Sequence, residues 1–292
     1  MAEFLQQVVN GLALGAIYAL IALGYSMVYG IIRLINFAHG DIIMVGAYVA
    51  YFSYELLHLG FIPSLLLAMV ACALLGVSIE RVAYKPLRDA PRIAALITAI
   101  GVSFLLENLF QVLFDPKQRP FPKFLARTEY SLAGVVVSSE QLLVFGISVL
   151  LMIFLNWVVM GTRIGRAMRA VSFDRDAARL MGVNVDTTIS ATFALGSSLA
   201  AAAGFLLGMY YQQFDPLMGF MPGLKAFVAA VVGGIGSIPG ALAGGFILGL
   251  TEVLVVSLGY STFRDGVAFA LLIIVLLVRP SGLLGGKEIE KV

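Results

Sequence analysis

The sequence predicts an all-α fold, a polytopic bundle of about 8–10 transmembrane helices that forms one integral-membrane domain over residues 1–292. Hydrophobic residues make up 60% of the chain and charged residues only 12%, about half the ~25% usual for a soluble protein. The mean hydropathy is +0.98. Apolar stretches long enough to cross a bilayer recur along the whole chain. These observations exclude a soluble enzyme, a DNA-binding protein and a disordered chain.

The expected spans follow from the apolar stretches. They cover residues 8–30, 37–57, 62–79, 93–114, 141–160, 189–211, 224–258 and 266–278. The stretch 224–258 is too long for one helix. Its centre, 233–240, contains the poor helix formers Gly233, Gly234, Gly236 and Pro239. We therefore expect two helices or half-helices on either side of this glycine-rich break, and about nine spans in all.

The distribution of positive charge predicts the orientation of the chain. Loops 31–36, 81–92 and 161–188, together with the C-terminal tail, hold 13 lysines and arginines, and the opposite loops hold 5. Because such charge accumulates on the cytoplasmic side, we expect a cytoplasmic C-terminus and a short N-terminus outside. The loop 115–140 carries four of the five opposing charges, and we expect it to be an external, partly structured segment.

A polar cluster lies at the start of the second span. Asn36, His39 and Asp41 follow Arg33 within nine residues. In a structural role, Asn36 would cap the helix and the helix dipole would favour Asp41 in the first turns. In a functional role, His39 and Asp41 would face a cavity. A metal site is not expected, because the second of the two histidines, His58, lies at the far end of the same span.

Two carboxylates fall inside predicted spans. Glu107 lies beside Asn108 in the fourth span, and Glu252 lies between the glycine-rich break and residue 258. A charged side chain at membrane depth costs about 2.5–3.5 kcal/mol and usually faces a cavity or a partner. Helix-packing hydrogen bonds are the alternative for both residues.

The loop 161–188 is predicted to form a short amphipathic element with a basic face, since arginines alternate with apolar residues at roughly helical spacing. One interpretation is ordinary positive charge on a cytoplasmic loop. The other is a docking helix for a cytoplasmic partner. Asp174 and Asp176 among the arginines fit a specific protein surface better than attraction to lipid.

Motifs for chemistry are missing from the sequence. It has no G-x-x-x-x-G-K-[ST] phosphate loop, and the nearest string fails because Glu288 follows Lys287. No G-x-S-x-G elbow is present. The single cysteine, Cys72, excludes an internal disulfide and a cysteine-based metal site. We therefore expect neither an ATPase activity nor a cofactor on this chain.

Four segments carry a resemblance to a known family. They are GLALGAIYALIALGYSMVYGIIRLINFAHGDIIMVGAYVA (11–50), DAARLMG (176–182), KAFVAAVVGGIGSIPGALAGGFILG (225–249) and RDGVAFALLIIVLLVRPSGLLG (264–285). The second is similar to the "EAA…G" coupling motif of ABC permeases, with aspartate for the first glutamate. Together they resemble the H-type permease of branched-chain amino-acid ABC importers. The likeness covers almost the whole chain apart from the loop 115–140.

The resemblance implies a multi-pass protein of the bacterial inner membrane, with no nucleic-acid partner. Its partners would be a second, related permease, two cytoplasmic ATP-binding subunits that hold ATP and Mg²⁺, and a periplasmic binding protein that delivers leucine, isoleucine or valine. The translocation path would include Asn36, His39, Asp41 and Glu252. The coupling loop to the ATPases would include Arg166, Arg169, Arg175, Asp176, Ala177, Ala178 and Gly182.

Other functions are compatible with the same residues. Permeases of this family for urea, amides or other small solutes would carry nearly the same motifs. A stand-alone secondary transporter or channel would also contain broken helices. An intramembrane enzyme could use His39 and Asp41 as an acid–base pair, although the sequence offers no nucleophile or metal to accompany them.

Overall fold

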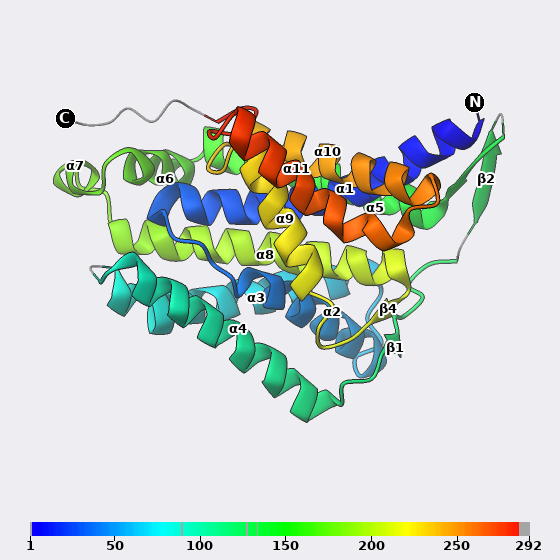
Figure 1. Ribbon diagram of the computed structural model, residues 1–292. Coiled ribbons are helices and arrows are strands. Elements are labelled where there is room, and N and C mark those ends of the chain that lie inside the picture. Colours follow the sequence, from blue (N-terminus) through cyan, green and yellow to red (C-terminus); the bar gives the residue numbers. More distant parts are fainter. Residues whose placement is uncertain (1, 89, 127, 133, 286–292) are drawn as a thin grey trace.

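The computed structural model describes residues 2–88, 90–126, 128–132 and 134–285, which form an elongated bundle of helices (Figure 1). The longer helices are α1 (Ala2–Ile32), α2 (His39–Glu55), α3 (Phe61–Ile79), α4 (Arg92–Phe114), α5 (Ser139–Gly161), α6 (Arg163–Phe173), α7 (Arg175–Leu180), α8 (Val185–Tyr211), α9 (Phe220–Gly233), α10 (Ile238–Ser257) and α11 (Arg264–Val278). The π-helix η1 (Glu80–Tyr84) and the 3₁₀ turn η2 (Lys85–Leu87) extend α3. A second 3₁₀ turn, η3 (Ser261–Phe263), precedes α11. The predicted all-α class is confirmed.

The predicted spans correspond to nine of these helices within the described residues, and 224–258 divides into α9 and α10. Seven helices, counted with their short extensions, are long and apolar enough to cross a membrane. The exceptions are α2, with 17 residues, and α9, with 14. At 1.5 Å per residue α9 is roughly 21 Å long, shorter than the ~30 Å hydrocarbon core of a bilayer. This chain is therefore a multi-pass membrane protein in which α9 on its own is too short to cross the bilayer core.

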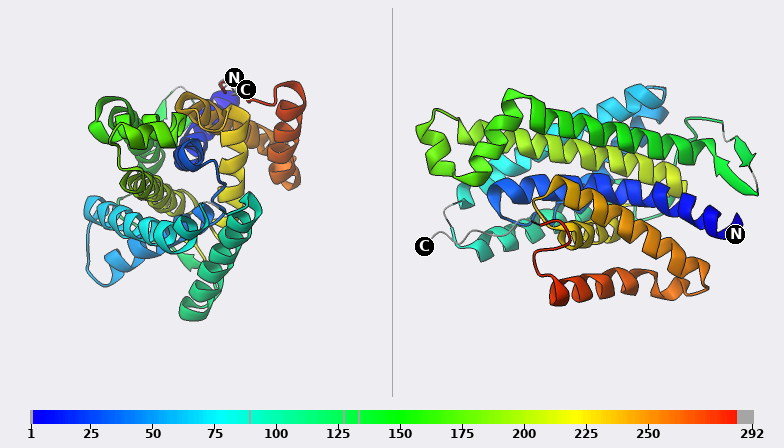
Figure 2. Two further views of the ribbon diagram at one scale, coloured as in Figure 1. Left: turned by 90° about the vertical axis from the view of Figure 1, so that its left-hand side faces the viewer. Right: turned by 90° about the horizontal axis from the view of Figure 1, so that it is seen from above.

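Helix α1 runs through the centre of the bundle and packs against α5, α8, α9 and α10. Viewed along the bundle, it lies inside while α4 and α11 lie at the periphery (Figure 2). Small residues make its crossing with α10 close. A Cβ on Gly249 would lie 2.3 Å from the Cα of Gly15, and one on Gly245 would lie 2.4 Å from the Cα of Ala19. Such small residues let helix backbones approach within a membrane.

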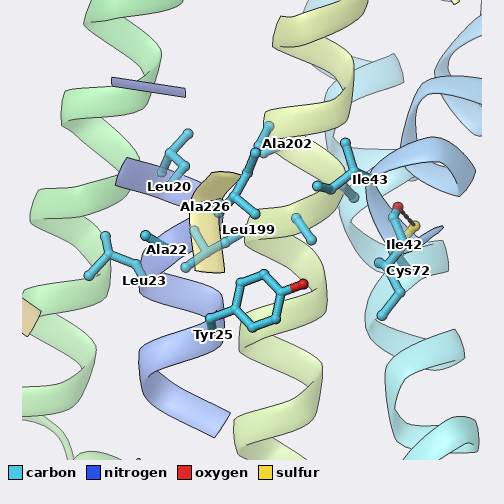
Figure 3. Close-up of a cluster of buried hydrophobic side chains, with 14 of the residues drawn as sticks. Leu20, Ala22, Leu23, Tyr25, Ile42, Ile43, Cys72, Leu199, Ala202 and Ala226 are labelled. Carbon is cyan, nitrogen blue, oxygen red and sulfur yellow. Dashed lines mark hydrogen bonds between the residues drawn. The ribbon is translucent and has the colours of Figure 1, made fainter. Parts of the chain in front are cut away.

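Apolar contacts around α1 form the main core. Figure 3 shows Leu20 and Leu23 of α1 beside Leu199 of α8, all with 3% or less of their surface exposed. On the far side of α8 the thiol of Cys72 in α3 donates to the carbonyl of Ile42 in α2, at 3.8 Å. The core thus joins α1, α2, α3 and α8 into one packed unit.

Opposite ends of the bundle carry different polar structures. At one end β2 (Glu129–Leu132) and β3 (Val135–Ser138) form an antiparallel hairpin, and the backbone N–H of Val136 donates to Gln6 of α1 at 2.7 Å. Strand β1 (Arg119–Pro120), which also lies in the segment 115–140, pairs with β4 (Gln213–Phe214), which follows α8. The hairpin projects beyond the helices, and α6 and α7 lie at the other end (Figures 1 and 2).

The positively charged loops lie together at one end of the bundle, as the charge count predicts. Arg175 donates to the carbonyl of Ile31 at 3.0 Å, and Arg88 forms an ion pair with Asp186. These contacts place loops 31–36, 81–92 and 161–188 at one end. Of the counted charges, Arg127, Lys287 and Lys291 lie outside the described residues. That the end with α6 and α7 faces the cytoplasm stays a prediction.

Two non-helical segments enter the bundle. Residues 33–38 fold back from the end of α1, where Arg33 has a φ of 52°, so that α2 begins in the interior. Residues 212–219 likewise lead from α8 to the buried start of α9. The glycine-rich segment 233–240 is instead a turn between α9 and α10, in which Gly234 and Gly236 have φ of 110° and 88°. The Ser237 side chain caps α10 by accepting from the N–H of Gly240 at 3.2 Å.

The crossing of α2 and α8 leaves no room for a side chain at Gly204. A Cβ there would lie 2.0 Å from the carbonyl oxygen of Ile43, a backbone atom that cannot rotate away. We expect Gly204→Ala to lower the free energy of unfolding by about 1–3 kcal/mol, since the two helices must separate. Thermal unfolding in detergent, followed by size-exclusion chromatography, measures this. Gly146→Ala, where nothing lies within 4 Å, is the control, and equal unfolding temperatures would contradict the prediction.

Candidate functional site

Asn36 lies in the segment that leads into α2, but it does not cap the helix. The N-cap residue is Ala38, without a capping side-chain hydrogen bond, so the expected cap is wrong. The reason is a stronger partner: the hydroxyl of Tyr84, from the π-helix η1, donates to Oδ1 of Asn36 at 2.9 Å. The side chain is 2% exposed, and its Nδ2 has no hydrogen-bond partner among the described residues. Asn36 therefore holds the re-entrant segment against η1.

His39 begins α2 deep in the bundle, with 1% of its surface exposed. Its ring lies against that of Tyr25, with centroids 4.5 Å apart. Gly24 makes room for it, because a Cβ there would lie 2.5 Å from Nε2. Within the described part of the chain, Nε2 has no hydrogen-bond partner. The His39 ring thus fills the space between the start of α2 and helix α1.

Asp41 lines a cavity of 80 Å³ between α1, α2, α4 and α9. The other lining residues are Tyr25, Phe37, Gly40, Ile100, Ser103, Phe104, Phe220, Gly223 and Leu224. The Asp41 side chain is 2% exposed, and its Oδ2 lacks a hydrogen-bond partner among the described residues. The cavity is therefore mostly apolar, with one carboxylate in its wall.

The N-terminal ends of α2 and α9 meet beside this cavity. A Cβ on Gly219 would lie 2.0 Å from the carbonyl oxygen of Gly40, and one on Gly223 would lie 2.7 Å from the Cα of Gly40. Only glycine permits this approach. The helix dipoles give the N-terminal ends of both helices partial positive charge.

Glu252 does not line this cavity; it lies in a separate cluster of charges. Its carboxylate, 1% exposed, contacts Nζ of Lys225 at 3.1 Å and also pairs with Arg264. The hydroxyl of Tyr18 donates to it at 2.9 Å. Lys225 also pairs with Asp265 at 2.6 Å. This cluster joins α1, α9, α10 and α11, so the helix-packing alternative accounts for Glu252.

Sequence reasoning missed a further buried carboxylate, Glu80, whose side chain is fully buried. It pairs with Arg88 and accepts from the hydroxyl of Ser190 at 2.6 Å. Arg88 and Lys85 both pair with Asp186 at the start of α8, the lysine at 2.7 Å. Glu80 directly follows the apolar run 62–79, so hydropathy alone places it at the beginning of a solvated loop. Glu107, the other carboxylate considered, is also buried, with 7% exposed.

The loop 161–188 folds as two short helices. Thr162 caps α6 by accepting from the N–H of Gly165 at 3.1 Å. Arg169 donates to the backbone of α5 at Val159, and Arg175 donates to the last turn of α1. These two arginines therefore position the loop on the helix ends, whereas Arg166 is exposed.

Helix α7 has well-defined ends. The side chain of Asp174 accepts from the N–H groups of Asp176 and Ala177, both at 3.0 Å. At the other end Gly182, with φ of 81°, ends the helix, and the N–H of Val183 donates to the carbonyl of Ala178 at 3.0 Å. This is a Schellman-type end that favours glycine. Ala178 packs inward at 5% exposed, while Asp176 and Ala177 are exposed.

Two large apolar side chains follow on the surface of this loop. Leu180 is 89% exposed and Met181 is 84% exposed. They lie at the far end of the bundle from the β2–β3 hairpin (Figure 1). Adjacent apolar side chains this exposed at the tip of an ordered loop indicate an interaction site.

Metal binding is not supported by side-chain placement. Among the residues that the structure describes, no three His, Cys, Asp or Glu side chains are placed to hold a metal ion.

The apolar helices, the two helices that begin inside the bundle and the carboxylate-bearing cavity at their meeting point define a membrane permease. The family model described as branched-chain amino acid transport system / permease component matches residues 7–276. The chain belongs to this family.

Curated relatives agree along the whole chain. The high-affinity branched-chain amino acid transport system permease protein BraD of Pseudomonas aeruginosa is 46% identical, over 99% of this chain and 98% of BraD. The corresponding protein LivH of Escherichia coli is 44% identical over the same shares. Among solved structures, PsaBC from Streptococcus pneumoniae in complex with Fab matches with a TM-score of 0.52 and 16% identity. That match covers 95% of this chain and 92% of the other, and it supports the fold alone.

Proposed function

We propose that this chain is the membrane-spanning permease of an ATP-driven importer for leucine, isoleucine and valine in the bacterial inner membrane. The observation that carries the proposal is its near-full-length identity of 44–46% to permeases of high-affinity branched-chain amino acid systems. The cavity beside Asp41 suits such solutes, because apolar side chains line most of its wall.

The proposed importer needs partners that this chain does not contain. They are a second, related permease, two cytoplasmic ATP-binding subunits that hold ATP and Mg²⁺, and a periplasmic solute-binding protein. ATP binding would close the ATPase pair and move the docked loop 161–188. This motion would open the path, which includes Asn36, His39 and Asp41, to the opposite side.

The α6–α7 loop is the proposed docking site for the ATP-binding subunits. Its backbone is fixed by the capping of α7 and by the two arginines that contact α5 and α1. It presents Leu180 and Met181 to the partner. A rigid loop with an apolar tip can transmit a displacement to α8, which begins five residues after Leu180.

Uptake of radiolabelled leucine tests the function, in cells that lack their own system and express the native transporter genes together. We expect ATP-dependent uptake that isoleucine and valine compete with and urea does not. Preferential competition by urea or amides would contradict the proposed solute. Uptake that persists without the ATP-binding subunits would indicate a stand-alone carrier.

Leu180→Asp tests the docking site in the same cells. We expect loss of leucine uptake and of co-purifying ATP-binding subunits at an unchanged level of the permease in the membrane, because a charge replaces the exposed apolar contact. Leu125→Asp, at the opposite end of the bundle and 40% exposed, is the control and should leave the ATP-binding subunits attached. Normal uptake by Leu180→Asp would disprove the docking site.

A further inference from the structure

The carboxylate of Asp41 is buried and only partly satisfied by hydrogen bonds. It lies at membrane depth with 2% of its surface exposed, and Oδ2 accepts no hydrogen bond from the described residues. Among the described residues that line its cavity there is no lysine, arginine or histidine. The hydroxyl of Ser103 donates a hydrogen bond to the Asp41 carboxylate, and Tyr25 is a further polar side chain in the lining. The nearby carboxylate of Glu107 adds negative charge. Because a buried charge is usually paired, this arrangement calls for a cationic group from a ligand.

The surroundings of Asp41 restrict that ligand. The apolar lining residues Ile100, Phe104, Phe220 and Leu224 come from α4 and α9 and favour an aliphatic body. Gly40 and Gly223 line the same cavity at the N-terminal ends of α2 and α9. The helix dipoles give these two helix ends partial positive charge, which favours a small anionic group of the ligand.

A metal ion fits this site poorly. Hard cations take six or more oxygen ligands, whereas this cavity offers one carboxylate, one hydroxyl from Ser103, a phenol and backbone groups. An organic ammonium needs fewer acceptors. One ligand class matches all three features of the cavity: a zwitterionic amino acid with an aliphatic side chain. Its ammonium would meet the carboxylate, its carboxylate would meet the helix ends, and its side chain would lie on the apolar wall.

We propose that Asp41 receives the ammonium group of the transported amino acid, while the N-terminal ends of α2 and α9 attract its carboxylate. The place where the N-terminal ends of α2 and α9 meet would thus bind both charged groups of the solute. At 80 Å³ the cavity has room for the ammonium and the adjacent carbon atoms. This role rests on the proposed function and specifies which residue selects for an amino acid.

Asp41→Asn in the complete transporter tests this role. The complex, purified from native membranes and reconstituted in proteoliposomes with its solute-binding protein, is assayed for uptake of labelled leucine. We expect the maximal rate to fall about 100-fold, as when one partner of a buried charge pair is lost. The half-saturating concentration of loaded binding protein should not change, because docking precedes transfer to the cavity. Glu55→Gln, an exposed carboxylate on the same helix, is the matched control and should transport normally.

Thermal unfolding separates a solute contact from a structural role. Removing a buried charge that is not paired with a cationic side chain of the described residues should leave the unfolding temperature of Asp41→Asn unchanged or raise it. Lost uptake with a lowered unfolding temperature would assign Asp41 to folding and overturn this role, and so would normal uptake. A wild-type transporter that does not move leucine would overturn the proposed function itself, which is a distinct result.

Discussion

Glu252→Ala is expected to lower the free energy of unfolding by about 3–5 kcal/mol, because it removes the shared partner of buried Lys225 and partly buried Arg264. Among the described residues, Lys225, with 4% of its side chain exposed, would keep Asp265, and Arg264 would keep the hydroxyl of Tyr211. The hydroxyl of Tyr18 would lose its acceptor as well. The effect arises from charges left unpaired rather than from the strength of the original pairs.

Thermal unfolding of the detergent-purified protein measures this change. Glu55→Ala, at an exposed position of α2, is the control and should unfold with the wild type. The double variant Glu252→Leu/Lys225→Met should be less destabilised than the sum of its two single variants, since each removes the other's unpaired charge. Strict additivity of the two single changes would show that the ion pair does not hold α9 to α10.

Features that depend on local sequence could be predicted. Apolar length alone located nine helices, and the glycines and proline at 233–240 located the turn between α9 and α10. Asp174 and Gly182 are also local signals, since an N-cap aspartate and a positive-φ glycine bound α7 in the structure. In each case the residue that determines the structure lies within a few positions of it.

Features that depend on contacts between distant segments could not be predicted. Hydropathy does not reveal that α2 begins inside the bundle, because that placement depends on packing against α8 and α9, which are distant in the sequence. The role of Asn36 was misjudged for the same reason, since its partner Tyr84 lies 48 positions away. Lys225 inside an apolar stretch was an overlooked signal, because such a lysine needs a carboxylate partner like Glu252.

The ion pairs around Glu80 predict an equally large loss of stability for a substitution of Arg88, at the opposite end of the bundle from Glu252. Arg88→Met would leave the fully buried carboxylate of Glu80 with the hydroxyl of Ser190, 2.6 Å away, as its remaining hydrogen-bond donor in the described structure. We expect the free energy of unfolding to fall by about 3–5 kcal/mol, since breaking one side of a buried ion pair strands the other charge. Asp186 would be affected less, because it is half exposed and keeps Lys85.

The matched control for Arg88→Met is Arg81→Met, an exposed arginine seven positions earlier that should leave the unfolding temperature unchanged. Glu80→Gln/Arg88→Met should recover part of the lost stability, because the double variant no longer buries a charge. If Arg88→Met and Arg81→Met unfold at the same temperature, Glu80 does not depend on Arg88. Recovery by the double variant would instead establish that this pair stabilises η1 against α8. Helix η1 also contains Tyr84, whose hydroxyl donates to Asn36 at the entrance to α2.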